Sequence, residues 1–553
     1  MREHNLHVTN TLTRRREKFE PLSPPHVGMY VCGPTVYGDA HLGHAKSYIS
    51  FDCIVRYLRY LGYEVTYVQN VTDVGHLTDD ADAGEDKVEK AARAKKVHPM
   101  QIAETFTRRY FEDMDALNVL RPYISPRASG HIIEQIELVK RLIERGHAYE
   151  ANGSVYFDVA SWPAYGRLSG RSVEEMLAGA RVEVSARAAS SVGEKRHPAD
   201  FALWKRAEPG HIMQWPSPWG MGYPGWHIEC TVMGQKYLGE TLDIHGGGIE
   251  NVFPHHEDEI AQAEAATPGA PGFVKYWLHN NMVTVSGKKM GKSLGNFLTL
   301  RDAFKKWDPM VIRLFILQSH YRSPTDFSEQ ALEAARAGYE RLAGAAAEAL
   351  EAARAGYERL TGATATLQKA AVGYERLAFT FANVEKQMAI IEGQKEMLQS
   401  SKLEEDKMLL DLVTQPTSEA TRNAIEQAES RVRAAMDNDF DTPGALAAIF
   451  DFARHVNRQV RADGGTIALR ELKDIHDTFS TLAGEILGLS LETTATGAAD
   501  TQIAAGLVQI LIEMRNEARK AKDFKGADAI RNRLAEAGIL LEDTPDGTTW
   551  RLK

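Results

Sequence analysis

The chain has 553 residues, a net charge of −10 and a sequence pI of about 6.1. A chain of this length exceeds what one hydrophobic core supports, so we expect three or four domains. The acidic balance excludes the simple class of uniformly basic nucleic-acid binders, so any RNA contact must use local basic patches.

The cysteines and the apolar segments indicate the compartment. Cys32, Cys53 and Cys230 are too few, and odd in number, for a disulfide framework, so we expect a cytoplasmic protein. No run of about 18 uncharged apolar residues occurs, which predicts no membrane contact through a spanning helix. The N-terminus has no apolar stretch of the kind that signal peptides carry.

The first part of the chain alternates strands and helices. Residues 29–32 form a short apolar run before a Gly-Pro turn, and residues 43–61 repeat apolar residues at helical spacing up to Gly62. A second strand-like run follows at residues 64–71. This β–α–β order predicts a parallel sheet with its site at the carboxyl ends of the strands.

The pattern then changes three times. Residues 121–205 lose the alternation and are interpreted as an inserted subdomain, after which sheet-like segments return. Residues 301–500 are helical in pattern, rich in Ala, Glu, Arg and Leu. Residues 501–553 predict a small α/β module with a strand after Gly538, a hairpin turn at Asp546 and Gly547, and a final strand at 550–552.

A short repeat stands out in the helical part. Gly-Tyr-Glu-Arg-Leu occurs three times between residues 337 and 377, with Tyr339, Tyr357 and Tyr374 in equivalent places. Five turns of a helix take about 18 residues, so Tyr339 and Tyr357 would share a face. We interpret the repeat as a duplication that lengthened a helical hairpin, with a partner-binding device as the alternative.

Residues 41–44, HLGH, open the first predicted helix. Anions favour helix N-termini, where free N–H groups and the helix dipole point outward. Gly43 lets a base or ribose approach the backbone, and His41 and His44 can donate to phosphate oxygens. Taken alone, two such histidines are more often capping residues.

Residues 288–293, KKMGKS, stand in a loop bracketed by Gly287 and Gly295. Mobile lysines such as Lys289 and Lys292 suit a polyphosphate whose charge separates during reaction. Taken alone, a lysine cluster in a loop is usually solvated surface.

Four further residues could hold a metal ion. His255 and Glu259 project to one side of a helix, and Cys32 and Cys230 could supply two thiolates. Such a set suits tetrahedral zinc. The alternative is that both cysteines are small buried hydrophobic residues.

The H-x-G-H motif together with the later lysine loop resembles the signature pair of class I aminoacyl-tRNA synthetases. The resemblance implies a Rossmann-type core in which an amino-acid carboxylate attacks the α-phosphate of ATP. Gly291 replaces the first serine of the family's K-M-S-K-S loop. The implied catalytic residues are His41, His44, Lys289 and Lys292, and the implied ATP site adds Gly43, Gly247 and Ser293.

Residues 29–37, 224–230, 243–248 and 253–259 resemble the cysteinyl-tRNA synthetase family. The resemblance implies one catalytic Zn²⁺ per chain on Cys32, Cys230, His255 and Glu259, with His256 as the second choice for the histidine ligand. It also implies Mg²⁺ with ATP, and a further substrate contact at Asp243. The implied cysteine-binding residues are Gly33, Thr72, Trp226 and His245.

The same resemblance assigns the domains. Residues 1–120 and 206–300 would form the two halves of the catalytic domain, residues 121–205 the insert, residues 301–500 a helical stem and bundle, and residues 501–553 the anticodon module. The implied partners are L-cysteine, ATP and tRNA(Cys), bound by a monomer. The implied tRNA-binding residues of the module are Arg531, Arg533, Trp550 and Arg551.

Zinc would let the site select cysteine over serine, because zinc prefers a soft thiolate to a hydroxyl. A hydrophobic pocket alone would reject serine only weakly. The close rival is the mycothiol-pathway ligase that joins cysteine to an amino sugar, which shares the core but lacks the C-terminal module. A non-catalytic zinc or RNA-binding protein is the rival of a different class. The intact H-x-G-H motif and both loop lysines argue against it.

Overall fold

The computed structural model describes residues 1–78, 85–172, 194–269, 272–285, 287–289, 297–363, 414–462, 468–491, 515, 539–544 and 547–552. The chain divides into two compact units, Met1–Leu491 and Glu492–Lys553.

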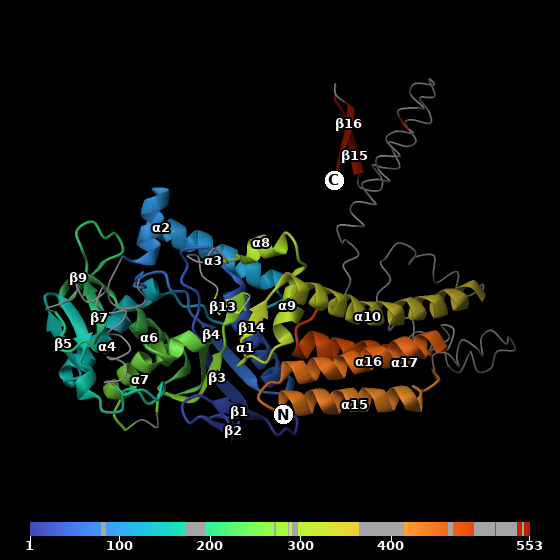
Figure 1. Ribbon diagram of the computed structural model, residues 1–553, viewed down its shortest axis with the longest axis horizontal. Coiled ribbons are helices and arrows are strands. Elements are labelled where there is room, and N and C mark those ends of the chain that lie inside the picture. Colours follow the sequence, from blue (N-terminus) through green and yellow to red (C-terminus); the bar gives the residue numbers. More distant parts are fainter. Residues whose placement is uncertain are drawn as a thin grey trace. The chain divides into compact units, whose positions relative to one another are not determined.

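A four-stranded parallel sheet forms the centre of the first unit (Figure 1). Its strands lie in the order β11 (Val274–Asn280), β10 (Leu242–Gly248), β3 (His26–Val31) and β4 (Glu64–Gln69). β10 lies directly beside β3, with Ile244 opposite Met29, although more than 200 residues separate them. The predicted parallel sheet and the Rossmann-type arrangement are therefore confirmed.

The two faces of this sheet carry different helices. Val27, Met29 and Val31 of β3 point into the hydrophobic cluster that contains α1 (Leu42–Tyr60). Tyr30 points to the opposite face, where α6 (Trp226–Leu238) and α7 (His255–Ala266) pack. Successive side chains of a strand alternate between faces, so one strand can serve both layers.

The inserted part forms its own antiparallel sheet beside α4 (Ile132–Glu144). The expected boundary at residue 205 falls inside this sheet, since β7 pairs with β9 and β9 ends at Pro224. Antiparallel pairing joins segments that are far apart in the chain, so no local sequence pattern marks where this sheet ends. The strands, in sheet order, are β5 (Ala148–Ala151), β6 (Ser154–Phe157), β7 (Phe201–Arg206), β9 (Gly220–Pro224) and β8 (Trp215–Ser217).

The described residues between 300 and 491 are mostly helical, as the composition predicts. Tyr339, in the first copy of the repeat, donates its hydroxyl to the carbonyl of Ser490 at 2.5 Å. The side chain of Tyr357 and the whole third copy of the repeat lie outside the described residues. The helices are α8 (Leu300–Phe304), α9 (Pro309–Leu317), α10 (Glu329–Ala363), α15 (Glu419–Met436), α16 (Thr442–Ala462), α17 (Leu469–Phe479) and the π-helical η5 (Ser480–Ile486).

Smaller elements complete the description. In the second unit β15 (Ile539–Thr544) and β16 (Gly547–Leu552) pair antiparallel with Thr544 opposite Gly547, so the predicted strands form a hairpin, while Gly547, predicted in the turn, belongs to β16. The others are β1 (His7–Asn10), β2 (Arg15–Lys18), α2 (Lys87–Lys95), α3 (Pro99–Ala116), η1 (Ala128–His131), η2 (Val159–Ser161), η3 (Ile249–Val252), β12 (Val283–Val285), β13 (Lys288–Lys289) and β14 (Thr325–Phe327).

Candidate active site and metal centre

The carboxyl ends of the parallel strands gather the sequence motifs. Cys32 directly follows β3, and its N–H donates to the carbonyl of Gly246 in β10 at 3.0 Å. Beyond β4, the N–H of Thr72 donates to the carbonyl of Pro34 at 3.1 Å. Residues far apart in the chain thus line one edge of the sheet, where ligands bind in open parallel sheets.

The H-x-G-H motif caps helix α1. The Nδ1 atom of His41 accepts from the N–H of Gly43 at 3.1 Å, and Nδ1 of His44 accepts from the N–H of His41 at 3.2 Å. The two ring centroids lie 3.9 Å apart. The motif therefore combines the capping role with two imidazoles at the positive end of a helix, where a phosphate is favoured.

Both ends of the lysine loop are fixed. On one side, β13 pairs with β12, and on the other Thr299 forms a backbone bridge with His41. The N–H of Leu300 donates to the carbonyl of Ala40 at 2.8 Å, and the ring of Phe297 lies 5.1 Å from that of His41. The loop therefore returns to the N-terminus of α1. The side chain of Lys289, and Lys292 and Ser293, lie outside the described residues.

Buried donor atoms cluster beside this helix end. One donor atom each from Cys32, His255, His256 and Glu259 lie within 4.8 Å of one another. The Sγ atom of Cys230 lies 3.9 Å from that of Cys32. All four residues predicted as metal ligands are thus brought together, from β3, α6 and α7.

His256, the second choice for the histidine ligand, also belongs to the cluster. Its Nε2 lies 3.1 Å from Sγ of Cys32, and its Nδ1 lies 2.7 Å from Nε2 of His279. His255 directs Nε2 to Oε1 of Glu259 at 3.1 Å, while its Nδ1 lies 2.9 Å from Nδ1 of His227. Each imidazole is therefore oriented by a hydrogen bond on its far side, which is typical of metal-binding histidines.

Burial disfavours the charged form of each of these groups in the metal-free chain. It raises the pKa of the Cys32 thiol to about 11 and the pKa of Glu259 well above its ordinary value. Burial, with neighbouring histidines, lowers the pKa of His255 and of His256 well below the ordinary value. Thiol, imidazole and carboxylate donors enclosed together are the donor set that zinc fits, and a divalent cation reverses the cost of their ionisation.

A hydrogen-bonded network stands behind the predicted cysteine pocket. The N–H of Gly33 donates to Oδ1 of Asn70 at 2.7 Å, and Nδ2 of Asn70 donates to Oγ1 of Thr72 at 3.1 Å. The hydroxyl of Thr72 donates to Oε1 of Glu229. Asn70 and Glu229 are not predicted from the sequence. The signal for Glu229 is its place next to Cys230 in the segment 224–230.

Gly33 has a structural reason of its own. A Cβ atom there would lie 1.5 Å from the carbonyl oxygen of Asn70, so any other residue would push the two strand ends apart. The backbone approach explains this glycine without reference to a substrate.

Trp226 and His245 border the cluster on different sides. The ring of Trp226 stacks on His255 at 4.3 Å and on His76 at 3.9 Å, and is half-buried. His245 is buried, and its Nε2 lies 2.8 Å from Oε2 of Glu259. Trp226 is thus the more accessible of the two, while His245 orients a predicted metal ligand.

Gly247 and Asp243, two predicted substrate contacts in β10, lie at different ends of that strand. A Cβ on Gly247 would come within 2.7 Å of the His256 ring, so the backbone of this glycine lies against the cluster. Asp243, at the other end of β10, accepts from the backbone N–H groups of Leu22 at 2.5 Å and Gly28 at 2.8 Å. Both carboxylate oxygens of Asp243 thus accept backbone N–H groups, and the residue lies away from the carboxyl ends of the strands.

Family models match three successive parts of the chain. A model of the tRNA synthetases class I (C) catalytic domain matches residues 18–337, more than half of the chain. A DALR domain matches residues 431–492, and a cysteinyl-tRNA ligase anticodon binding domain matches residues 507–551. The cysteine–tRNA ligase of Chlorobaculum tepidum is 48% identical over 558 residues and covers 99% of both chains.

The chain belongs to the cysteine–tRNA ligase family. The cysteine–tRNA ligases of Porphyromonas gingivalis, at 46% identity, and Thermus thermophilus, at 45%, also match over their full lengths. The family places the chain among the aminoacyl-tRNA ligases.

Solved structures of other tRNA synthetases share the fold. Methionyl-tRNA synthetase of Mycobacterium tuberculosis, bound to methionyl-adenylate, matches with a TM-score of 0.53 at 14% identity. The match covers 84% of this chain and 92% of that chain. A leucyl-tRNA synthetase of Agrobacterium radiobacter matches with a TM-score of 0.51 at 12% identity. The class I fold of the family is therefore observed here.

Two of the four predicted tRNA-binding residues belong to the hairpin of the second unit. The backbones of Trp550 and Arg551 lie in β16, opposite Leu541 and Leu540, and Arg531 and Arg533 lie outside the described residues. Among the described residues, no helix is both long enough and apolar enough to cross a membrane.

Proposed function

We propose that the chain activates L-cysteine with ATP and transfers it to tRNA(Cys). The observation that carries the proposal is the cluster of Cys32, His255, His256 and Glu259 at the edge of the sheet where the H-x-G-H helix begins. A thiol-selecting site and a phosphate-binding helix end would then lie at the same edge of the sheet. The full-length similarity to cysteine–tRNA ligases supports the same substrates.

In the first step the cysteine carboxylate attacks the α-phosphate of ATP, which carries Mg²⁺. His41 and His44 donate to the phosphate oxygens from the positive end of α1, and Lys289 and Lys292 stabilise the departing pyrophosphate. Gly43, Gly247 and Ser293 complete the ATP site. The reaction needs positioning and charge stabilisation but no protein nucleophile.

Cys32, Cys230, His255 and Glu259 would hold one zinc ion, with His256 as the alternative histidine. When bound, zinc would act as a Lewis acid that binds the cysteine side chain as thiolate and discriminates against serine. The residues of the chain orient the rest of the amino acid. Gly33 and Thr72 lie on one side of it, Trp226 covers it, and His245 fixes the carboxylate of Glu259.

In the second step a terminal adenosine hydroxyl of the tRNA attacks the cysteinyl adenylate. Arg531, Arg533, Trp550 and Arg551 of the C-terminal module would contact the anticodon through phosphates and stacking. We propose a cytoplasmic monomer with the five-part domain order set out above.

The test uses the three cysteines of the chain. Cys32→Ser and Cys230→Ser should lower zinc affinity by at least roughly 100-fold, because each removes a ligand, and should abolish charging of tRNA(Cys). Cys53→Ser is the matched control, since Cys53 lies elsewhere, in the core beside Leu487. It should retain zinc and charge tRNA, because a serine hydroxyl also donates a hydrogen bond at the place of the Cys53 thiol beside the Leu487 carbonyl. Zinc is measured by elemental analysis and charging with labelled cysteine.

Two results would contradict the proposal. Full charging by a zinc-free Cys32→Ser variant would remove the metal from the mechanism. Cysteine-dependent ATP–pyrophosphate exchange without any charging of tRNA would leave activation standing and favour an amino sugar as the acceptor. The match of residues 507–551 to an anticodon binding domain argues against that acceptor.

A further inference from the structure

We propose that Arg313 is a positioning residue that ties the end of the helical bundle to α1, so that transfer to tRNA depends on it more than activation does. The bundle end is residues 487–491, the last of the first unit, from which the chain continues to the anticodon-binding match at residues 507–551. The inference rests on the proposed function.

The guanidinium of Arg313 is fully buried, donates to four groups through their oxygen atoms, and has the Cys53 thiol 3.8 Å from Nη2. Its Nε donates to the carbonyl of Leu487 at 2.8 Å, and its Nη1 donates to the carbonyls of Leu117 at 2.9 Å and Asn118 at 3.0 Å. Its Nη2 donates to the carboxylate of Asp52. Only the planar fork of arginine offers donors in this arrangement, because the single ammonium of a lysine cannot reach four acceptors at once.

The partners come from separate functional parts of the chain. Asp52 lies in α1, two helical turns beyond His44. Leu117 and Asn118 follow α3, and Leu487 follows η5 at the end of the bundle. Arg313 itself lies in α9, which the chain enters from the lysine loop through α8. One buried side chain therefore joins the helix of the H-x-G-H motif to the bundle end.

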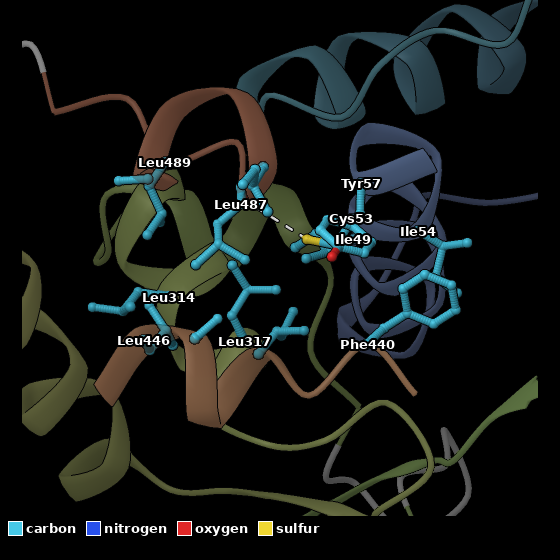
Figure 2. Close-up of a cluster of buried hydrophobic side chains, with 14 of the residues drawn as sticks. Ile49, Cys53, Ile54, Tyr57, Leu314, Leu317, Phe440, Leu446, Leu487 and Leu489 are labelled. Atoms are coloured by element: carbon cyan, nitrogen blue, oxygen red, sulfur yellow. Dashed lines mark hydrogen bonds between the residues drawn. The ribbon is translucent and has the colours of Figure 1, made fainter. Parts of the chain in front are cut away.

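The chain at the bundle end is shaped around this guanidinium. Gly488 has a φ of +63°, and a Cβ there would come within 2.3 Å of Nη2 of Arg313. Asn118 donates from Nδ2 to the carbonyl of Gly488 at 2.7 Å. Figure 2 shows Leu487 facing Cys53 of α1, with the thiol 3.8 Å from the Leu487 carbonyl.

Loss of the Arg313 guanidinium would affect α1 and the bundle end unequally. Asp52 keeps a donor on each oxygen, because Leu120 N–H donates to Oδ1 and Arg56 Nε donates to Oδ2, both at 2.8 Å. Helix α1 also remains packed in the central core. The Leu487 carbonyl loses its N–H donor and keeps only the Cys53 thiol, at 3.8 Å. The bundle end therefore loosens while the activation site keeps its place.

The experiment compares two reactions in two variants of the full chain. Arg313→Lys keeps the charge but loses the fork, and Gly488→Ala keeps Arg313 but crowds it at a positive φ. In both, kcat/KM for tRNA(Cys) charging should fall about tenfold while cysteine-dependent ATP–pyrophosphate exchange changes less than about twofold. Gly488→Ala preserves the test where Arg313→Lys fails to fold.

The control is Leu472→Ala, at a buried leucine of α17 that makes none of these contacts. Its Tm should fall, while the ratio of charging to exchange should stay that of the wild type. An equal fall of both reactions in the Arg313 and Gly488 variants, or the same split in Leu472→Ala, would overturn the inference. A wild-type chain that exchanges but never charges would overturn the proposed function and this inference with it, and the wild-type arm alone would reveal it.

Discussion

His41 and His44 cap the N-terminus of α1, and we propose that they also contact the phosphates of ATP. Nδ1 of His41 accepts the N–H of Gly43, the N-cap task that Asn, Asp, Ser or Thr perform best, and Nδ1 of His44 accepts the N–H of His41. Capping alone does not require a histidine at position 41. The proposed contact between its imidazole and a phosphate would explain why a histidine stands there. The two tasks can be separated by substitution.

We predict that His41→Asn keeps the helix but not the reaction. Asparagine accepts the same N–H, so the free energy of unfolding should change by less than about 1 kcal/mol. ATP–pyrophosphate exchange should fall roughly 100- to 1000-fold, because the imidazole donor to the phosphate is lost. Denaturant unfolding and exchange kinetics measure the two effects. His41→Ala is the control that should lose both, and wild-type exchange by His41→Asn would refute the assigned phosphate contact.

The metal site makes a prediction about pH. In the metal-free chain the pKa of Cys32 is about 11, so at pH 7 its thiol holds a proton that a metal ion must displace. Zinc affinity should therefore rise with pH, by roughly tenfold per unit for each proton released. Competition with a chelator at pH 6, 7 and 8 measures this dependence. An affinity that stays constant over this range would mean that no thiol proton is displaced.

At the scale of one element, α1 buries a lysine. Lys46 is fully buried, and its Nζ donates to the carbonyl of His320 at 3.2 Å. Desolvation by burial lowers its pKa from the ordinary 10.5 to about 8. The folded state therefore binds this proton less tightly than the unfolded state, and the charged lysine opposes folding.

We predict that Lys46→Met stabilises the protein at pH 7. The cost of the buried ammonium, on the order of 3 kcal/mol, is present in full below pH 8 and is relieved as pH rises towards 10.5. The advantage of Lys46→Met should therefore shrink between pH 8 and pH 10. Denaturant unfolding of both proteins at several pH values measures it.

Lys140→Met, at a half-exposed lysine of α4, is the control and should show no such dependence on pH. A Lys46→Met variant that is less stable than the wild type at pH 7 would show that the hydrogen bond to His320 outweighs the desolvation.

Some helices and strands follow from local sequence patterns, and others depend on pairing between distant segments. The helix predicted at residues 43–61 is α1, since its apolar spacing is local and Gly62, with a φ of +94°, ends it. The sheet of the insert is different. Its strand β7 pairs directly with β9, which follows β8 in the chain, so the expected boundary at residue 205 lies inside the sheet.

At the scale of the whole molecule, the chain divides after Leu491. We predict that residues 1–491 alone retain cysteine-dependent ATP–pyrophosphate exchange within about threefold, because a compact unit keeps its own core. Charging of tRNA(Cys) should fall at least roughly 100-fold, because the anticodon contacts are lost. Steady-state kinetics of both reactions test this. Undiminished charging by residues 1–491 would mean that the C-terminal module does not read the anticodon.

The sequence by itself determined the parallel sheet, helix α1, the terminal hairpin and the residues proposed as metal ligands. These features follow from local spacing and from residue chemistry, which a linear pattern records. Only the tertiary structure decided that His256 joins Cys32, 224 residues away, and that Asn70 and Glu229 support the pocket. It also decided that Arg313 meets Asp52 and Leu487. Such contacts depend on how distant segments pack, because burial and register bring together groups that no local spacing connects.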